Sequence, residues 1–184
     1  MAHKNNSIND AELVRRLRVV PDFPVKGVQF FDVTTLFKDA DALEEIISRI
    51  CALYKDKGIT KVAGIESRGF IAGAAVAARL GAGFVPVRKP GKLPAKVVSE
   101  SYAKEYGTDT IEIHADAITP DDVVLIHDDI IATGGTACAA IRLVKQFQPK
   151  ALYTNFIIDI TDVPRITPLP EDVAVTAILH LSER

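Results

Sequence analysis

The chain has 184 residues, and its 22 lysines and arginines nearly balance 24 aspartates and glutamates, which gives a net charge of −2 and a pI near 6.1. A protein so close to neutral lacks the basic surface that binds nucleic acid, so we expect no nucleic-acid partner. Cys51 and Cys138 lack metal-ligand spacing, which is typical of a cytoplasmic protein with free thiols.

The first 37 residues predict a helix followed by a loop rich in aromatic residues. The opening ten residues are polar and lack the apolar core of a signal peptide. Leucines and valines at helical spacing predict a helix over residues 10–19, with Asp10 as its cap. The loop that follows, PDFPVKGVQFFDVTTLF, carries four phenylalanines. So much aromatic area covers either the core or a flat ligand, and composition alone favours the core.

Most of the remaining chain alternates between apolar runs typical of strands and helical patterns. The predicted helices span residues 39–56, 70–80 and 137–147, and the predicted strands span 59–65, 83–87, 123–126, 151–158 and 173–179. This alternation predicts one α/β domain over residues 1–184, with a mainly parallel central sheet and helices on both faces. The longest apolar stretch, residues 70–78, is too short to span a bilayer, so we expect no membrane contact.

Residues 92–118 depart from this alternation and predict a β-hairpin. Two short strands, Val97–Val98 and Thr110–Ile113, flank the polar segment SESYAKEYGTD. A hairpin with so long a polar tip is typical of a flexible flap that contributes little to the core. Glu105 and Tyr106 lie in this tip, and Glu105 is either a solvated loop carboxylate or a functional group.

The strongest functional signal is the stretch VVLIHDDIIATGGT over residues 123–136. A buried strand is predicted to end at Asp128 and Asp129, and the chain then turns through glycines into a helix. Such a turn offers N–H groups, threonine hydroxyls and a helix dipole to a phosphate, while the carboxylates can accept hydrogen bonds from ribose hydroxyls. The stretch lacks the lysine of a GxxxxGK[ST] loop and the spacing of GxGxxG. An ordinary strand-to-helix turn is the alternative.

Two other predicted strands end in basic residues. Ser67 and Arg68 follow the strand over residues 59–65, and Arg88 and Lys89 follow the next one. Because parallel sheets bind ligands at the carboxyl ends of their strands, we expect these groups and the two aspartates to converge on one crevice. A guanidinium beside helix N–H groups is an anion site, whereas a solvated surface arginine is the alternative.

Five segments, in order and spacing, resemble the adenine phosphoribosyltransferases within the type I phosphoribosyltransferase family. They are PDFPVKGVQFFDVT, ESRGF, VPVRKPGKLP, SYAKEYG and HDDIIATGGT. The TGGT turn is a signature of the wider family, and RKPGKLP with SYAKEYG indicates the adenine-specific members. The resemblance implies purine salvage, in which adenine and phosphoribosyl pyrophosphate give AMP and pyrophosphate. It also implies Mg²⁺ bound through the substrate rather than directly by the protein, and a homodimer.

The resemblance implies a role for each motif. Asp128 and Asp129 would hold the ribose hydroxyls of phosphoribosyl pyrophosphate. The 5′-phosphate would be held by the signature turn, which comprises Ala132, Thr133, Gly134, Gly135 and Thr136. The pyrophosphate would be held by the residues after the two other strands, namely Ser67, Arg68, Arg88 and Lys89.

The resemblance also implies that residues 1–37 form a helix and a small hood over the base, with residues 92–118 as the flap. Phe30 and Ile130 would sandwich the purine, with Gln29 and Phe31 beside its edge. Phe31 departs from the family, which often has arginine or another polar residue there. On the flap, Glu105 would be the general acid or base and Tyr106 would help to close the site.

Three further expectations follow from single residues. His127 replaces an aliphatic strand residue, and a lone histidine there is more typical of a satisfied strand-end residue than of a catalyst. A transferase for a 6-oxo purine, the second hypothesis, needs a donor such as lysine, and Lys26 is the only candidate near the hood. The third hypothesis is a regulatory protein that senses phosphoribosyl pyrophosphate. Such proteins tend to have a DNA-binding extension and to lose the flap chemistry, whereas this chain retains Glu105.

Overall fold

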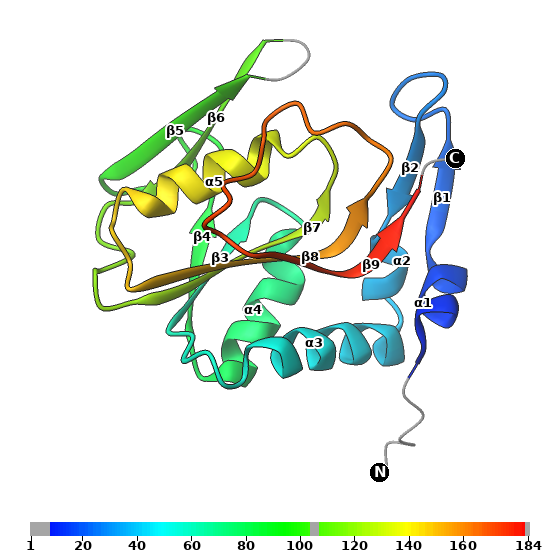
Figure 1. The fold of residues 1–184 in the computed structure, drawn as a ribbon, viewed down its shortest axis with the longest axis horizontal. Coiled ribbons are helices and arrows are strands. Elements are labelled where there is room, and N and C mark those ends of the chain that lie inside the picture. Colours follow the sequence, from blue (N-terminus) through cyan, green and yellow to red (C-terminus); the bar gives the residue numbers. More distant parts are fainter. Residues whose placement is uncertain (1–7, 104–106, 183–184) are drawn as a thin grey trace.

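The centre of the fold is a five-stranded sheet with the strand order β4-β3-β7-β8-β9 (Figure 1). The computed structural model describes residues 8–103 and 107–182. The sheet strands are β3 (Lys61–Ile65), β4 (Gly83–Val87), β7 (Val123–Ile131), β8 (Ala151–Ile160) and β9 (Val175–Leu181). All neighbouring pairs are parallel, which confirms the predicted fold class.

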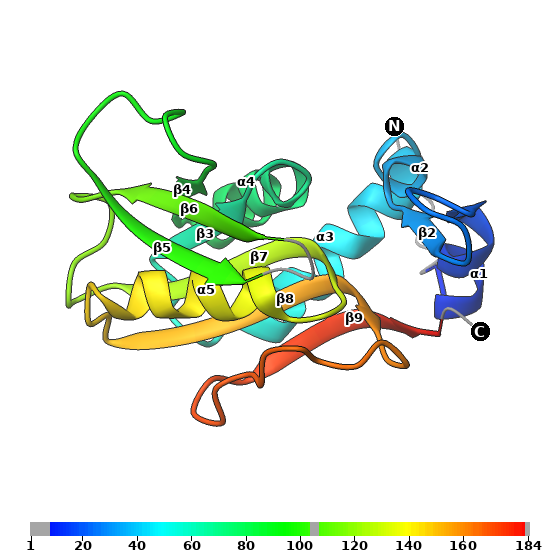
Figure 2. The ribbon, with the colours of Figure 1, turned by 90° about the horizontal axis from the view of Figure 1, so that it is seen from above.

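Helices cover both faces of the sheet (Figure 2). The three long ones are α3 (Ala40–Tyr54), α4 (Gly69–Leu80) and α5 (Gly135–Lys145). On β7, Leu125 packs with the cluster of α3 and α4, whereas Val124 and Ile126 pack with the cluster of α5. Successive side chains of a strand point to opposite faces, so an unbroken apolar run marks a strand buried on both sides. None of the helices in the described part of the chain is long and apolar enough to cross a membrane.

Two antiparallel ribbons stand at opposite ends of the sheet (Figures 1 and 2). Their strands are β1 (Arg18–Pro21) with β2 (Gln29–Asp32), and β5 (Val97–Ala103) with β6 (Thr108–His114). The β5–β6 ribbon is attached just beyond β4, where Arg88 and Glu112 exchange two backbone hydrogen bonds of 2.9 and 2.8 Å. The hairpin expected from the sequence is therefore present.

The strands of this hairpin are longer than predicted, and they are part of the core. Ile111, Ile113 and Tyr102 are buried and pack in the cluster of α5. Ile111 and Ile113 are separated by one residue, so both side chains lie on the same face of β6. The expectation that the hairpin contributes little to the core is wrong for these residues.

The N-terminal segment also differs from the prediction. The helix expected over residues 10–19 ends at Arg16 as α1 (Asp10–Arg16), and its cap is Asn9, whose side chain accepts the Glu12 N–H at 2.9 Å. The next residues form β1, because Val19 and Val20 pair with Phe31 and Phe30 of β2. The predicted loop therefore contains β2 and a short helix, α2 (Thr34–Phe37). Pairing between distant residues overrides the helical spacing here.

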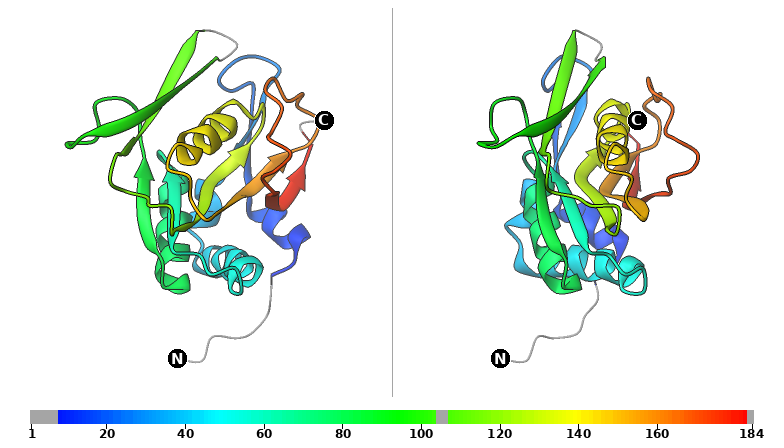
Figure 3. Two further views of the ribbon diagram at one scale, coloured as in Figure 1. Left: turned by 60° about the vertical axis from the view of Figure 1, so that its left-hand side comes forward. Right: turned by 90° about the vertical axis from the view of Figure 1, so that its left-hand side faces the viewer.

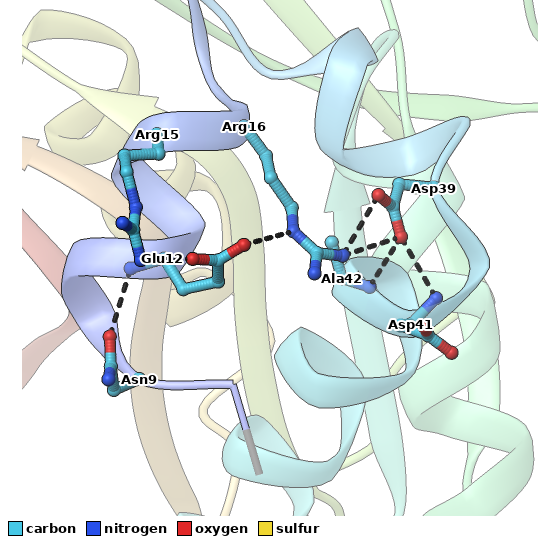
Figure 4. Close-up of polar contacts among 7 residues, drawn as sticks. All are labelled: Asn9, Glu12, Arg15, Arg16, Asp39, Asp41 and Ala42. Carbon is cyan, nitrogen blue, oxygen red and sulfur yellow. Dashed lines mark hydrogen bonds and ion pairs between the residues drawn. The ribbon is translucent and has the colours of Figure 1, made fainter. Parts of the chain in front are cut away.

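One carboxylate joins α1 to the start of α3 (Figure 4). Both oxygens of Asp39 accept hydrogen bonds from Arg16 Nη1, at 3.0 and 2.9 Å. Asp39 Oδ1 also caps α3 by accepting the N–H groups of Asp41 and Ala42 at 3.1 Å. The bond from Ala42 and the charge of Arg16 hold the pKa of Asp39 below its ordinary value.

We expect Asp39→Ala to lower the free energy of unfolding by about 1 kcal/mol near neutral pH, as for the loss of other helix caps. A lowered pKa means that the ionised carboxylate stabilises the fold above the ordinary carboxyl pKa, and that this contribution is lost as the pH falls through the folded-state pKa. Urea melts at several pH values would measure it. Asp39→Asn keeps a cap acceptor and should lose less, so equal losses in both variants would contradict the capping role.

Candidate active site

Asp128 and Asp129 lie within β7 and not after its end, which corrects the prediction. The strand continues because its register with β8 continues, with Ile130 opposite Ile158. Pairing with β3 on the other side ends at His127, so Asp128 lies where the sheet opens. The start of α4 approaches this point so closely that a Cβ atom at Gly69 would lie 2.7 Å from the His127 carbonyl oxygen.

The two carboxylates have different environments. Asp129 is buried, and its Oδ2 accepts a hydrogen bond from Arg68 Nε in an ion pair. Asp128 is half-buried and faces the pocket. Removal from water, and then the negative charge of Asp129, raise the pKa of Asp128 well above its ordinary value. Titratable groups perturbed in this way are typical of functional sites.

A pocket of about 150 Å³ opens beside Asp128. It is lined by residues from the ends of β3, β4 and β7, from the β5–β6 hairpin and from the start of α5, namely Ile65, Glu66, Val87, Arg88, Lys89, Tyr102, Ile111, Asp128 and Thr136. The structure thus brings Arg88, Lys89 and Asp128 together, as the sequence predicts for strand ends of a parallel sheet. Ser67 is exposed on the turn that precedes α4.

Each cation of the pocket is held by a carboxylate that the sequence analysis missed. Arg88 forms a two-point contact with Glu66, with Nη2 to Oε1 at 3.0 Å and Nε to Oε2 at 3.2 Å. Lys89 Nζ pairs with Asp109 and lies 5.9 Å from the centre of the Tyr102 ring. Glu66 directly precedes Ser67 at the end of β3, so its place in the sequence could have identified it as a residue of the site. Asp109 lies about twenty positions away on another ribbon, and nothing in the sequence connected it to Lys89.

The signature turn has the geometry of an anion site. Gly134 has a φ of 84°, a left-handed conformation that favours glycine, and α5 starts directly after it without a side-chain cap. The first N–H groups of a helix lack partners within the helix, so those of α5 are available to a ligand. Thr136 Oγ1 donates to the Tyr102 hydroxyl at 3.0 Å, which joins the turn to β5. Tyr102 is a further residue that the sequence analysis did not select.

The ribbon of β1 and β2 places an aromatic residue beside Arg68. The Phe30 ring lies 6.0 Å from Arg68 Cζ and meets Phe23, which is half exposed, edge to face at 5.1 Å. Phe31 and Ile130 instead pack against the core cluster of α3 and α4. The four phenylalanines of the predicted loop are therefore divided between the core and the surface near the site.

Three predicted residues need separate mention. Glu105 and Tyr106 lie outside the described residues. His127 is fully buried, and its Nδ1 lies 3.2 Å from Asn155 Oδ1, while Nε2 has no partner among the residues that the structure describes. Burial lowers the pKa of His127 to about 4, so the ring is neutral at physiological pH. Within the described chain, no three His, Cys, Asp or Glu side chains are grouped to hold a metal ion.

Comparisons of the sequence and of the structure with known proteins point to the same family. Residues 33–162 match the phosphoribosyl transferase domain. A protein from Phocaeicola vulgatus named adenine phosphoribosyltransferase is 59% identical over 92% of this chain and 97% of its own length. The crystal structure of adenine phosphoribosyltransferase from Rhodothermus marinus aligns with a TM-score of 0.86 at 50% identity, over 92% and 96% of the two chains. That from Saccharomyces cerevisiae, complexed with an imino-altritol bisphosphate and adenine, aligns with a TM-score of 0.77 at 38% identity, over 84% and 94%.

We expect Asp128→Asn to raise the melting temperature near neutral pH. A raised carboxyl pKa means that the ionised form destabilises the fold above the folded-state pKa, and that this penalty is absent below the ordinary pKa. Asparagine removes the charge and can still accept the Asp129 N–H, which Asp128 Oδ1 accepts at 2.9 Å. A gain of roughly 2–4 °C is expected for each kcal/mol relieved, and it should vanish in acid.

Asp129→Asn is the matched control, because it removes the ion-pair partner of Arg68 and should lower the melting temperature. Thermal melts of both variants over a pH series would measure this. Equal destabilisation by both changes would contradict the assigned difference between the two carboxylates.

Proposed function

The chain belongs to the phosphoribosyl transferase domain family, and we infer that it transfers 5-phosphoribosyl from phosphoribosyl pyrophosphate to adenine, giving AMP and pyrophosphate in purine salvage. The observation that carries this is that Asp128, Arg88 and Lys89 line one and the same pocket, in a chain so similar to enzymes named for this reaction. The activity is a pentosyl transfer, and we propose that residues 1–184 form one domain for it.

We propose that the sugar pyrophosphate lies across the carboxyl ends of β3, β4 and β7. Asp128 and Asp129 accept hydrogen bonds from the ribose hydroxyls, and residues 132–136 donate to the 5′-phosphate. Arg88 and Lys89, with Ser67 and Arg68, hold the pyrophosphate. The first N–H groups of α5, a helix without a side-chain cap among the described residues, support the phosphate assignment, and the cations that line the pocket support the pyrophosphate assignment.

The base is assigned to the side of the site nearest the β1–β2 ribbon. Phe30 stacks on one face of adenine and Ile130 on the other, and the backbone around Gln29 reads the edge of the ring. The position of Phe30 beside Arg68 supports this assignment. Phe31, like Ile130, packs against the cluster of α3 and α4 and is only partly buried, so it is assigned to the edge of the ring beside Gln29.

The chemistry requires stabilisation of separated charge. As the bond from the anomeric carbon to pyrophosphate breaks, the sugar gains oxocarbenium character and the leaving group gains negative charge. Arg88 and Lys89 are already oriented by Glu66 and Asp109, so little reorganisation is needed when that charge develops. A ring nitrogen of the purine attacks the anomeric carbon, and Glu105 exchanges a proton with the purine during this step. Tyr106 helps to close the site.

We also propose Mg²⁺ as a cofactor, a homodimer and a cytoplasmic location. Magnesium prefers oxygen ligands and is commonly bound through substrate phosphates with one or two carboxylates. The half-buried carboxylate of Asp128 and the hydroxyl of Thr136 line the pocket, so its donors fit a metal that arrives with the pyrophosphate. The metal would supply charge neutralisation on the leaving group. Exposed Val19, Phe23 and Val25 on the hood support an interface between two copies.

The reaction is tested by mixing the purified chain with phosphoribosyl pyrophosphate, Mg²⁺ and one base at a time. We expect AMP from adenine, and little nucleotide from hypoxanthine, guanine or xanthine, because Lys26 is the only candidate donor near the hood for a 6-oxo oxygen. Omission of Mg²⁺ should abolish turnover, and light scattering should report a dimer. Preferential conversion of a 6-oxo purine, or tight substrate binding without any product, would contradict the proposed activity.

Glu105→Gln should reduce turnover by roughly 10²–10⁴-fold if Glu105 transfers a proton in the transition state. Glutamine keeps the shape and can still form hydrogen bonds, so the Michaelis constants and the melting temperature should change little. Steady-state kinetics and a thermal melt measure both. Asp116→Asn is the control, because it removes one exposed carboxylate after the same hairpin. A fully active Glu105→Gln variant would exclude the acid–base role.

A further inference from the structure

The loop between β8 and β9, residues 161–174, lies directly against the signature turn. In Figures 1 and 3 this loop, coloured orange to red, runs beside α5 and the end of β7. Three consecutive residues of the turn, 132–134, are contacted by the loop. The sequence analysis assigned no role to this segment.

Arg165 makes the central contact. Its Nη1 donates to the Ala132 carbonyl oxygen, and its Nη2 donates to Asp159 Oδ1 in an ion pair. Asp159 lies on β8 opposite Ile131 of β7, so the carboxylate is fixed by the sheet. The guanidinium therefore connects the sheet to the first carbonyl of the turn. The terminal nitrogens Nη1 and Nη2 each have a partner within the protein, so Arg165 is placed to act on a ligand through the turn that it holds.

Neighbouring residues of the loop complete the contact. The Ile166 N–H donates to the Thr133 carbonyl oxygen at 3.0 Å. A Cβ atom at Gly134 would lie 3.2 Å from the Thr167 carbonyl oxygen, so the loop packs tightly on the glycine. At the next turn of α5, the Cys138 thiol donates to the Pro168 carbonyl oxygen at 3.3 Å.

Peptide geometry gives these contacts a consequence for the ligand. In a trans peptide, the C=O and the following N–H are coplanar and point in opposite directions. Fixing the Ala132 carbonyl therefore fixes the Thr133 N–H, and fixing the Thr133 carbonyl fixes the Gly134 N–H. Because Arg165 and Ile166 hold both carbonyls toward the loop, both N–H groups point to the opposite side of the turn. Successive N–H groups directed to one side form an anion-binding concavity.

We propose that Arg165 is a positioning residue that shapes the turn for the 5′-phosphate of the sugar substrate. The inference rests on the proposed function, since it deepens the role of residues 132–136. It predicts that loss of Arg165 weakens the hold on the 5′-phosphate and leaves the pyrophosphate subsite at Arg88 and Lys89 unchanged, because those residues are held by Glu66 and Asp109.

The test uses Arg165→Met and two probes that separate the subsites, ribose 5-phosphate and pyrophosphate with Mg²⁺. Calorimetric titration should show a Kd for ribose 5-phosphate raised about 10–100-fold, the scale known for residues that orient the ligands of a metal ion. The Kd for pyrophosphate should be unchanged. In steady-state kinetics, the KM for phosphoribosyl pyrophosphate should rise while the KM for adenine stays constant. Arg165→Lys, which keeps one charged donor, should recover part of the affinity.

Lys145→Met is the matched control. Lys145 pairs with Asp172 at 2.6 Å, so this change also removes a cation that joins α5 to the same loop, but at the end of α5 away from the turn. It should leave the binding of both probes unchanged. If Arg165→Met does not fold, Asp159→Ala takes its place, because it removes the acceptor that holds the other side of the guanidinium and should raise only the Kd for ribose 5-phosphate.

The outcomes separate the two proposals. A parent protein that makes AMP, with a folded Arg165→Met variant that binds ribose 5-phosphate normally, would overturn the role of Arg165 alone. Equal weakening of both probes would overturn it as well, because it would indicate a general loss of structure. A parent protein that binds neither probe would overturn the proposed function together with this inference.

Discussion

The placement of two adjacent carboxylates inside a buried strand is the constraint on which the rest of the site depends. Asp128 and Asp129 continue the register of β7 with β8, so neither can move away without breaking the sheet. Adjacent charges in such a place are costly unless they are paired or neutralised. Arg68 forms an ion pair with Asp129 and so offsets the cost of its charge. The cost of a second charge on Asp128 is not offset, and the raised pKa of Asp128 reflects that cost. A ligand whose hydroxyl groups donate hydrogen bonds to these oxygens would lower the cost of ionising them.

The same balance of charges extends over the whole site. Arg68, Arg88 and Lys89 are paired with Asp129, Glu66 and Asp109 respectively. Each of these three cations is therefore balanced by a carboxylate of the protein itself. The carboxylates also hold the cations in fixed geometry, and preorganised charges stabilise a developing anion better than mobile ones. In the site that we propose, an incoming pyrophosphate would share these cations with their carboxylate partners, so the cations would orient it more than they would tighten its binding.

Much of the fold and part of the site could be predicted from local sequence. The run from Val123 to Ile126, the glycines of the turn and the basic residues after β3 and β4 each carry their signal within a few positions. Parallel strands then place their carboxyl ends together by a general rule. The prediction was wrong where distant pairing decides the structure. Val19 and Val20 are in a strand because Phe30 and Phe31 lie opposite, and β7 passes its aspartates because β8 continues beside it.

The sequence could not reveal which residues outside the signature turn hold it in place. Tyr102 accepts the Thr136 hydroxyl from one side, while Arg165 binds the Ala132 carbonyl from the other. Tyr102 lies in the SYAKEYG segment, where nothing in the sequence connects it to the turn, and Arg165 lies in no recognised motif. The TGGT sequence makes a left-handed turn possible, because Gly134 adopts a positive φ without cost. The contacts that hold its carbonyl groups come instead from the loop between β8 and β9, and the contact that holds the Thr136 hydroxyl comes from the hairpin. The phosphate-binding turn that we propose therefore depends on three segments that the fold brings together, of which the motif is only one.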